Sequence, residues 1–142
     1  MSRPKLTLEI AYNLAEALFN ASGERDERLE SVIAQDTERA YAYALNVLKG
    51  PFPEGEPAIA RHLHLAYRYA RHVIKRPFPE AELAIAQDPE LAFWYARYVL
   101  KSSWPEAEFV ISKQPFIAYE YMDLLKTPED IARFKEVQQW SV

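Results

Sequence analysis

The 142-residue chain has no cysteine, only three glycines and only three histidines. Without cysteine it has no disulfide framework and no thiol for catalysis, which is consistent with a reducing cytoplasm. The few glycines leave no glycine-rich phosphate loop and few flexible linkers. No run of about 18 apolar residues exists, so a membrane span is not expected. A net charge of −4 lacks the basic excess that a strong nonspecific nucleic-acid binder requires.

What the chain does have is repetition at a fixed 26-residue offset. Residues 50–60 align with residues 76–86 and are identical at 8 of 11 positions. A third copy begins near Ser102. Internal repeats of about 20–50 residues indicate a stacked array of supersecondary units, each of which buries its apolar face against its neighbours.

Each repeat predicts a pair of helices. In the unit that begins at Asp36, the apolar and aromatic side chains of residues 40–48 fall on one helical arc of about 160°. A turn follows, and a Pro-Glu pair then starts a second, shorter helix of about eight residues. One aromatic residue of each turn is expected to fill the elbow between the two helices: Phe52, Phe78 and Trp104.

We therefore predict an all-α fold, an α-solenoid of about four and a half short helical hairpins with atypical end caps. The whole chain, residues 1–142, is expected to form a single helical-repeat domain. Its predicted parts are a degenerate repeat 7–35, repeats 36–61, 62–87 and 88–113, a half repeat 114–126, and a C-terminal capping helix 127–140. The degenerate repeat carries about three extra residues near Ser22, since its longer helix matches the next one at an offset of 29.

A glutamate and a tyrosine recur at equivalent places in successive repeats: Glu30, Glu56, Glu82 and Glu108, and Tyr43, Tyr69, Tyr95 and Tyr121. The glutamate shares the apolar face of the short helix, and a buried carboxylate requires hydrogen-bond partners. A buried tyrosine hydroxyl requires one as well. We expect a ladder in which each glutamate accepts from a tyrosine hydroxyl or from turn amides. Its repetition favours a structural role, because a catalytic pair is needed only once.

The outward face of the longer helix varies between repeats while the inward positions barely change. In helical arrays a variable face is typical of a binding surface. The residue types that gather there, arginine, tryptophan and tyrosine, are enriched at interface hot spots. The candidate partner-binding residues are Arg68, Arg71, His72, Trp94, Arg97 and Tyr98. Among them Trp94 is the best single candidate, since an outward indole requires an explanation.

Residues for catalysis, cofactor binding or metal binding are not recognisable. The chain has no nucleophile–base pair and no cluster with metal-ligand spacing. His62 and His64 point in different directions on a helix, and His72 lies about 15 Å further along it. His62 also replaces the capping aspartate of the other repeats, so its cap is expected to be weak. We expect no enzyme, no cofactor and no metal site.

The pattern Ala-x-x-Tyr-Ala-x-x-Val-Leu/Ile-Lys-x-x-Phe/Trp-Pro-Glu-Ala-Glu-x-x-Ile resembles tandem repeats of uncharacterised phage and bacterial proteins. The resemblance covers roughly residues 36–126. It implies a helical array and a bacteriophage origin, and it carries over no catalytic residue. By analogy, a small phage protein without a catalytic site is often a binder of a host component.

We expect a non-catalytic protein–protein interaction module, a phage-encoded protein that binds and inhibits a host defence factor. Its expected location is the host bacterial cytoplasm, because the charged first nine residues do not fit a secretory signal. The alternative is a nucleic-acid-binding accessory protein that uses the Arg/Trp/Tyr stripe, which the acidic total disfavours. The sequence leaves the partner and the oligomeric state open, although a poorly capped end could stack on its own copy.

Overall fold

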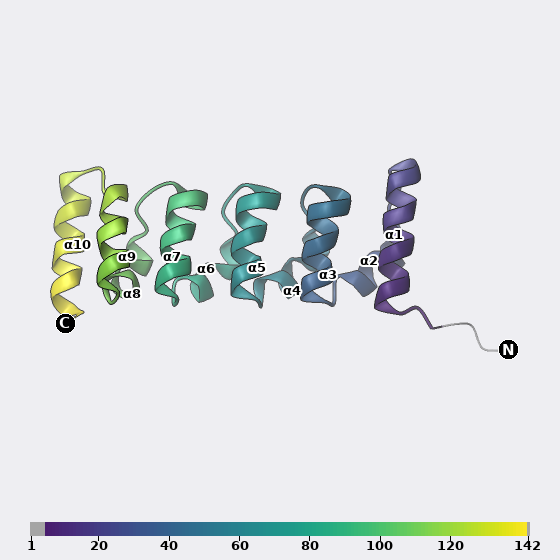
Figure 1. Ribbon diagram of the computed structural model, residues 1–142, viewed down its shortest axis with the longest axis horizontal. Coiled ribbons are helices and arrows are strands. Elements are labelled where there is room, and N and C mark those ends of the chain that lie inside the picture. Colours follow the sequence, from purple (N-terminus) through teal and green to yellow (C-terminus); the bar gives the residue numbers. More distant parts are fainter. Residues whose placement is uncertain (1–4, 142) are drawn as a thin grey trace. The chain divides into compact units, whose positions relative to one another are not determined.

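The computed structural model describes residues 5–141, so predictions that fall on residues 1–4 and 142 lie outside it. Within 5–141 the chain forms ten α-helices with short π and 3-10 segments and no strand (Figure 1), which confirms the all-α prediction. No helix in this range combines the length and the apolar character that a membrane crossing requires. The chain divides into two compact units, Met1–Ile74 and Lys75–Val142, which are described in turn.

Unit 1 contains five α-helices. They are α1 (Leu8–Ser22), α2 (Glu27–Ile33), α3 (Thr37–Ala42), α4 (Glu56–Ala60) and α5 (Leu63–Arg68). π segments extend α3 over Tyr43–Leu48 and α5 over Tyr69–Ile74, and a 3-10 turn at Pro53–Gly55 leads into α4. The longer helices α1, α3 and α5 stand side by side, with the short α2 and α4 connecting them (Figure 1).

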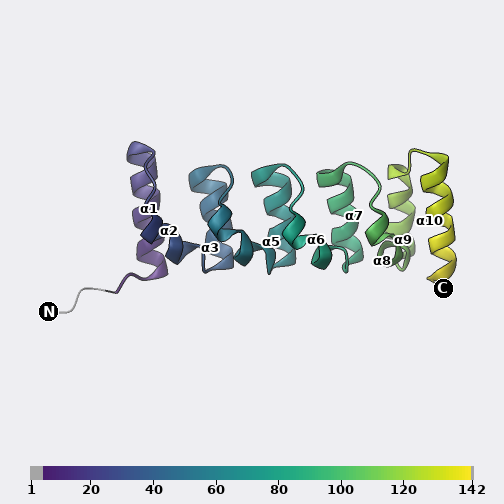
Figure 2. The same ribbon diagram turned by 180° about the vertical axis from the view of Figure 1, so that it is seen from behind.

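Unit 2 repeats this alternation of short and long helices. Its helices are α6 (Pro79–Ile85), α7 (Pro89–Tyr95), α8 (Glu108–Ser112), α9 (Pro115–Tyr121) and α10 (Pro128–Trp140). A π segment at Ala96–Leu100 extends α7, and 3-10 turns at Pro105–Ala107 and Met122–Leu124 lead into α8 and follow α9. The helices α7, α9 and α10 run side by side, and α8 packs against all three of them (Figure 2).

Polar side chains fix where the longer helices begin. Asp88 caps α7 by accepting a hydrogen bond from the Leu91 amide at 2.9 Å, with a proline directly after the cap. Thr127 caps α10 in the same way, which confirms the predicted C-terminal helix. At α5 the imidazole of His62 takes over this role, because its Nδ1 accepts from the Leu65 amide at 3.3 Å. The cap that the sequence predicted to be weak is therefore formed, with a longer hydrogen bond.

The longer helices of the repeats are not α-helical along their whole length, which departs from the prediction. Their second halves are π-helical, and the amide of Lys49 donates to the Ala44 carbonyl five residues back. Lys101 makes the same bond to Ala96. Both lysines lie in the left-handed region, with φ of 54° and 57°, and end their helices there. The recurrent lysine therefore has a backbone role, because it ends the helix in the left-handed region.

Candidate interaction surface

A hydrogen-bonded relay joins each elbow to the glutamate of the short helix that follows it. In unit 2 the Phe78 amide donates to the Tyr95 hydroxyl at 2.8 Å, and that hydroxyl donates to Glu82 Oε1 at 2.7 Å. The tyrosine lies on the longer helix, Phe78 directly precedes α6, and Glu82 lies within the first turns of α6. One fully buried hydroxyl thus satisfies a turn amide and a carboxylate together.

The relay recurs with the repeat. Its other members are Phe52–Tyr69–Glu56 in unit 1 and Trp104–Tyr121–Glu108 in unit 2, while Tyr43 donates to Glu30 at 2.6 Å. The predicted tyrosine–glutamate ladder is confirmed. Of the two donors that the prediction allowed, the tyrosine hydroxyl is the one that reaches the carboxylate, and the turn amides donate to that hydroxyl.

The elbow aromatics are buried as predicted, and two of them, Phe52 and Trp104, link consecutive tyrosines. The Phe52 ring lies 5.0 Å from the Tyr43 ring, while its amide bonds to the hydroxyl of Tyr69. Trp104 stands in the same relation to Tyr95, with ring centroids 5.1 Å apart. Edge and tilted aromatic contacts of this kind add to the burial energy. They hold successive hairpins of a unit in a fixed register.

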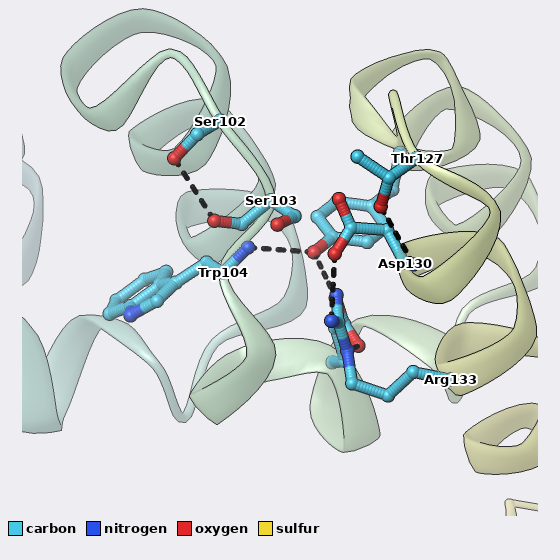
Figure 3. Close-up of polar contacts among 8 residues, drawn as sticks. Ser102, Ser103, Trp104, Thr127, Asp130 and Arg133 are labelled. Atoms are coloured by element: carbon cyan, nitrogen blue, oxygen red, sulfur yellow. Dashed lines mark hydrogen bonds and ion pairs between the residues drawn. The ribbon is translucent and has the colours of Figure 1, made fainter.

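Two arginines that the sequence analysis missed neutralise the most buried glutamates. Arg25 donates to both oxygens of Glu30, at 2.7 and 3.1 Å. Arg133 extends from α10 and donates to both oxygens of Glu108, at 2.8 and 2.7 Å (Figure 3). A buried carboxylate requires such a partner. Each arginine occurs once, outside the 26-residue pattern, so the repeat gave no signal for it.

Burial sets the protonation of the ladder. It raises the pKa of Tyr43, Tyr95 and Tyr121 well above the ordinary value, and the hydrogen bond to the neighbouring glutamate raises it further. The hydroxyls therefore stay protonated at neutral pH and act as donors. The hydrogen bonds to Glu108 likewise raise the pKa of Arg133. Such groups do not change their protonation state near neutral pH, which fits a structural role.

Of the predicted interface residues, three lie in unit 1. Arg68 lies on α5 and His72 on the π segment that follows it, and both side chains are exposed. Arg71 is only half-buried rather than fully outward, because its Nη1 donates to the Tyr67 hydroxyl at 3.0 Å. Unit 1 therefore contributes two outward basic side chains and one that is held against its own helix.

The other three lie together in unit 2. Trp94 on α7 is 37% exposed, and Tyr98 on the following π segment is 41% exposed. Arg97 is exposed beside them, with its guanidinium carbon 5.7 Å from the Tyr98 ring centroid. Residues three and four apart on a helix share a face, so the indole, the phenol and the guanidinium adjoin one another. The structure groups the six predicted residues as two sets of three, one in each unit.

A hollow of about 530 Å³ adjoins the unit 2 set. Five residues line it: Arg97, Lys101, Asp123, Leu124 and Lys126. Its three cations take part in no ion pair within residues 5–141. Lys101 and Lys126 were not predicted as part of this surface, although lysine recurs at this helix end in the sequence. We call this hollow the basic hollow.

A second exposed apolar region of unit 2 departs from the prediction. Tyr119 shares a repeat position with the buried Tyr67 and Phe93, yet it is 73% exposed. It lies with Met122 at a hollow of about 470 Å³ between α9 and the end of α10. Within residues 5–141, α9 is followed by α10 and not by a hairpin like the earlier ones, so this repeat position loses the neighbour that would cover it.

Within residues 5–141 no group of three or more histidine and acidic side chains converges as a metal site would require. His62 and His64 face each other edge to face, with ring centroids 6.2 Å apart. Comparisons with protein-family models, curated proteins and solved structures find no match to this chain. The side chains described above are therefore the basis for the function proposed below.

Proposed function

We propose that the chain is a non-catalytic protein–protein interaction module whose helical hairpins stack as an α-solenoid of about four and a half hairpins with atypical ends. The proposal is supported by the difference between the inward and the outward positions of each hairpin. The inward positions repeat the tyrosine–glutamate relay, whereas the outward positions change from one repeat to the next. A fixed frame with a variable face is how repeat proteins present a binding surface.

The single observation that carries the proposal is the exposed face of α7 and its π extension. There Trp94 and Tyr98 present large aromatic area beside Arg97. These three residue types dominate the energetics of protein interfaces. The adjoining basic hollow adds Lys101 and Lys126, so the face complements a partner surface that combines carboxylates with an apolar side chain.

The resemblance to phage and bacterial repeats supports a narrower form of the proposal. In that form the chain is a phage-encoded protein that acts in the host bacterial cytoplasm, where it binds and inhibits a defence factor. Blocking by occupancy needs a surface and no catalytic group. The outward face of unit 2 supplies such a surface.

The experiment is an affinity capture from bacterial lysate with three forms of the full chain. The wild type is compared with Trp94→Ala/Arg97→Ala, and with a control, Trp140→Ala/Lys135→Ala, that removes an exposed indole and a cation from α10. All three are first checked for equal helicity and melting temperature. A protein retained by the wild type and the control but lost by the first variant supports the proposal. Equal retention by all three contradicts the assignment of this face.

A second candidate function rests on the same face. Aromatic side chains beside unpaired cations also suit single-stranded nucleic acid, in which bases stack and phosphates meet arginine and lysine. The acidic total of the chain and the carboxylate of Asp123 in the basic hollow disfavour a long phosphate track. Titration of a labelled oligonucleotide at low and high salt separates the two functions, because phosphate binding weakens steeply with salt. Salt-sensitive binding that Trp94→Ala abolishes would favour this candidate.

A further inference from the structure

The outer side of α1 carries an apolar stripe that no described residue of unit 1 covers. Its members recur at spacings of four, three and four residues: Ile10, Leu14, Ala17 and Ala21. All are exposed, Ile10 at 45% and Leu14 at 51%. The opposite side of the helix packs against α2 and the π segment after α3, where the Tyr12 ring lies 6.0 Å from the Tyr43 ring. This spacing is the seam pattern of two packed helices.

We infer that the stripe is a contact between two copies of this chain, with the two α1 helices antiparallel about a twofold axis. The inference is independent of the proposed function. The order of side-chain sizes along the stripe carries it. The two large residues occupy its N-terminal half and the two small ones its C-terminal half. In an antiparallel pair centred between Leu14 and Ala17, each large side chain meets a small one, as dense packing requires.

Other arrangements fit the stripe less well. A parallel pair would set Ile10 against Ile10 and Ala21 against Ala21. The two large isoleucines would push the helices apart at their N-terminal ends, and the two small alanines would leave a gap at their C-terminal ends. A twofold axis makes a closed dimer, whereas contact with a different part of the chain would continue into a filament. The stripe pairs with itself, so a closed dimer follows.

The polar residues beside the stripe suit the same register. Asn13 and Asn20 flank it on one side, and the antiparallel register places Asn13 of one helix next to Asn20 of the partner copy. Facing amides can exchange hydrogen bonds. The stripe itself carries no charge, so the pairing brings no like charges together at its centre.

The size of the contact sets its strength. A 15-residue helix is about 22 Å long, and one such pair buries less than the roughly 1,600 Å² of a standard interface. We therefore expect a reversible dimer that forms with increasing concentration in the micromolar to millimolar range, and not an obligate one. Its consequence would be two partner-binding faces in one assembly, which raises avidity.

The test exchanges the side-chain sizes at positions 14 and 17 of the stripe. Sedimentation equilibrium of the full chain then measures the association of two copies. Leu14→Ala leaves a gap and Ala17→Leu brings two large residues together, so each is expected to weaken the dimer roughly tenfold or more. The double variant Leu14→Ala/Ala17→Leu restores one large and one small residue at each contact. It is expected to recover most of the association.

Both positions are exposed in the single chain, so circular dichroism and thermal melting should show unchanged folding. A second control, Tyr119→Ala, removes exposed apolar area from α9 and should leave association unchanged. A wild type that stays monomeric at the highest concentration overturns the inference. So does a dimer that ignores all three α1 variants, or a double variant no better than the single ones.

Discussion

Arg133 of α10 grips the fully buried carboxylate of Glu108 with two parallel hydrogen bonds, Nε to Oε1 at 2.8 Å and Nη2 to Oε2 at 2.7 Å. The next residue, Phe134, packs its ring 4.9 Å from that of Tyr121. It therefore occupies the role that Phe52 and Trp104 have toward the tyrosines of their repeats. Two adjacent residues of α10 thus complete the last tyrosine–glutamate pair: Arg133 neutralises Glu108, and Phe134 packs on Tyr121.

Removing this arginine should destabilise unit 2 strongly. In Arg133→Ala the buried carboxylate of Glu108 keeps only Tyr121 as a partner, and breaking such a pair costs on the order of 3 kcal/mol of unfolding free energy. Adding Glu108→Gln should recover part of the loss, because the unpaired charge is removed as well. The control Arg28→Ala changes a surface pair with a separation of 3.9 Å and should matter little. Urea unfolding compares these three variants with the wild type. Similar losses of unfolding free energy for Arg133→Ala and Arg28→Ala would contradict the pairing.

The middle of the ladder gives a second prediction. Tyr95→Phe leaves the Phe78 amide and one oxygen of Glu82 without their partner, which should cost about 1–3 kcal/mol. Glu82→Gln keeps an acceptor at the same place and should cost less, though still measurably. The double variant should lose less than the sum, since both changes act on one shared hydrogen bond, which Tyr95→Phe alone already removes.

The control for that cycle is Tyr119→Phe, which deletes a hydroxyl from an exposed ring. Its unfolding midpoint should match the wild type. If Tyr95→Phe also matched the wild type, the ladder would not contribute to stability, and its recurrence would need another cause.

Much of the helical framework could be predicted from the sequence, because the same residue pattern occurs in several successive repeats. The caps at Asp88 and Thr127, the buried elbow aromatics and the tyrosine–glutamate pairs all followed from residue type and spacing. Each depends on local geometry, which a sequence pattern reflects directly.

What the sequence did not reveal depends on single residues and on ends. Arg25 and Arg133 occur once each, so no recurrence marks them. The exposure of Tyr119 follows from a missing neighbour and not from its own position in the repeat. The π-helical turns change the hydrogen-bond partner by one residue while leaving the apolar pattern intact, so periodicity alone reads them as α.

Stability should fall in alkaline solution because of the buried tyrosines. The pKa of Tyr95 and Tyr121 is raised in the folded chain, while in the unfolded chain it is near 10.0. Their contribution is therefore complete below pH 10.0 and is lost as the pH rises toward the folded-state pKa, because only the unfolded chain ionises there. The loss approaches about 1.4 kcal/mol per pH unit for each tyrosine.

Urea unfolding at a series of pH values, from neutral to above pH 10.0, would show this slope in the free energy of unfolding. Tyr95→Phe should reduce it. Equal slopes for wild type and Tyr95→Phe would show that the hydroxyl ionises as readily in the folded chain as in the unfolded one.

The left-handed lysines offer a stabilising change. Lys49 ends the first π segment with φ of 54°, a conformation that costs a residue with a Cβ about 1 kcal/mol relative to glycine. Lys49→Gly removes that strain and loses some unfolded-state restriction, so we expect a net gain of roughly 0.5 kcal/mol. Lys113 caps α8 in the right-handed region with φ of −72°, so Lys113→Gly should instead lower stability. Thermal melting compares the two, and a gain for both would trace the effect to lost charge rather than to the backbone.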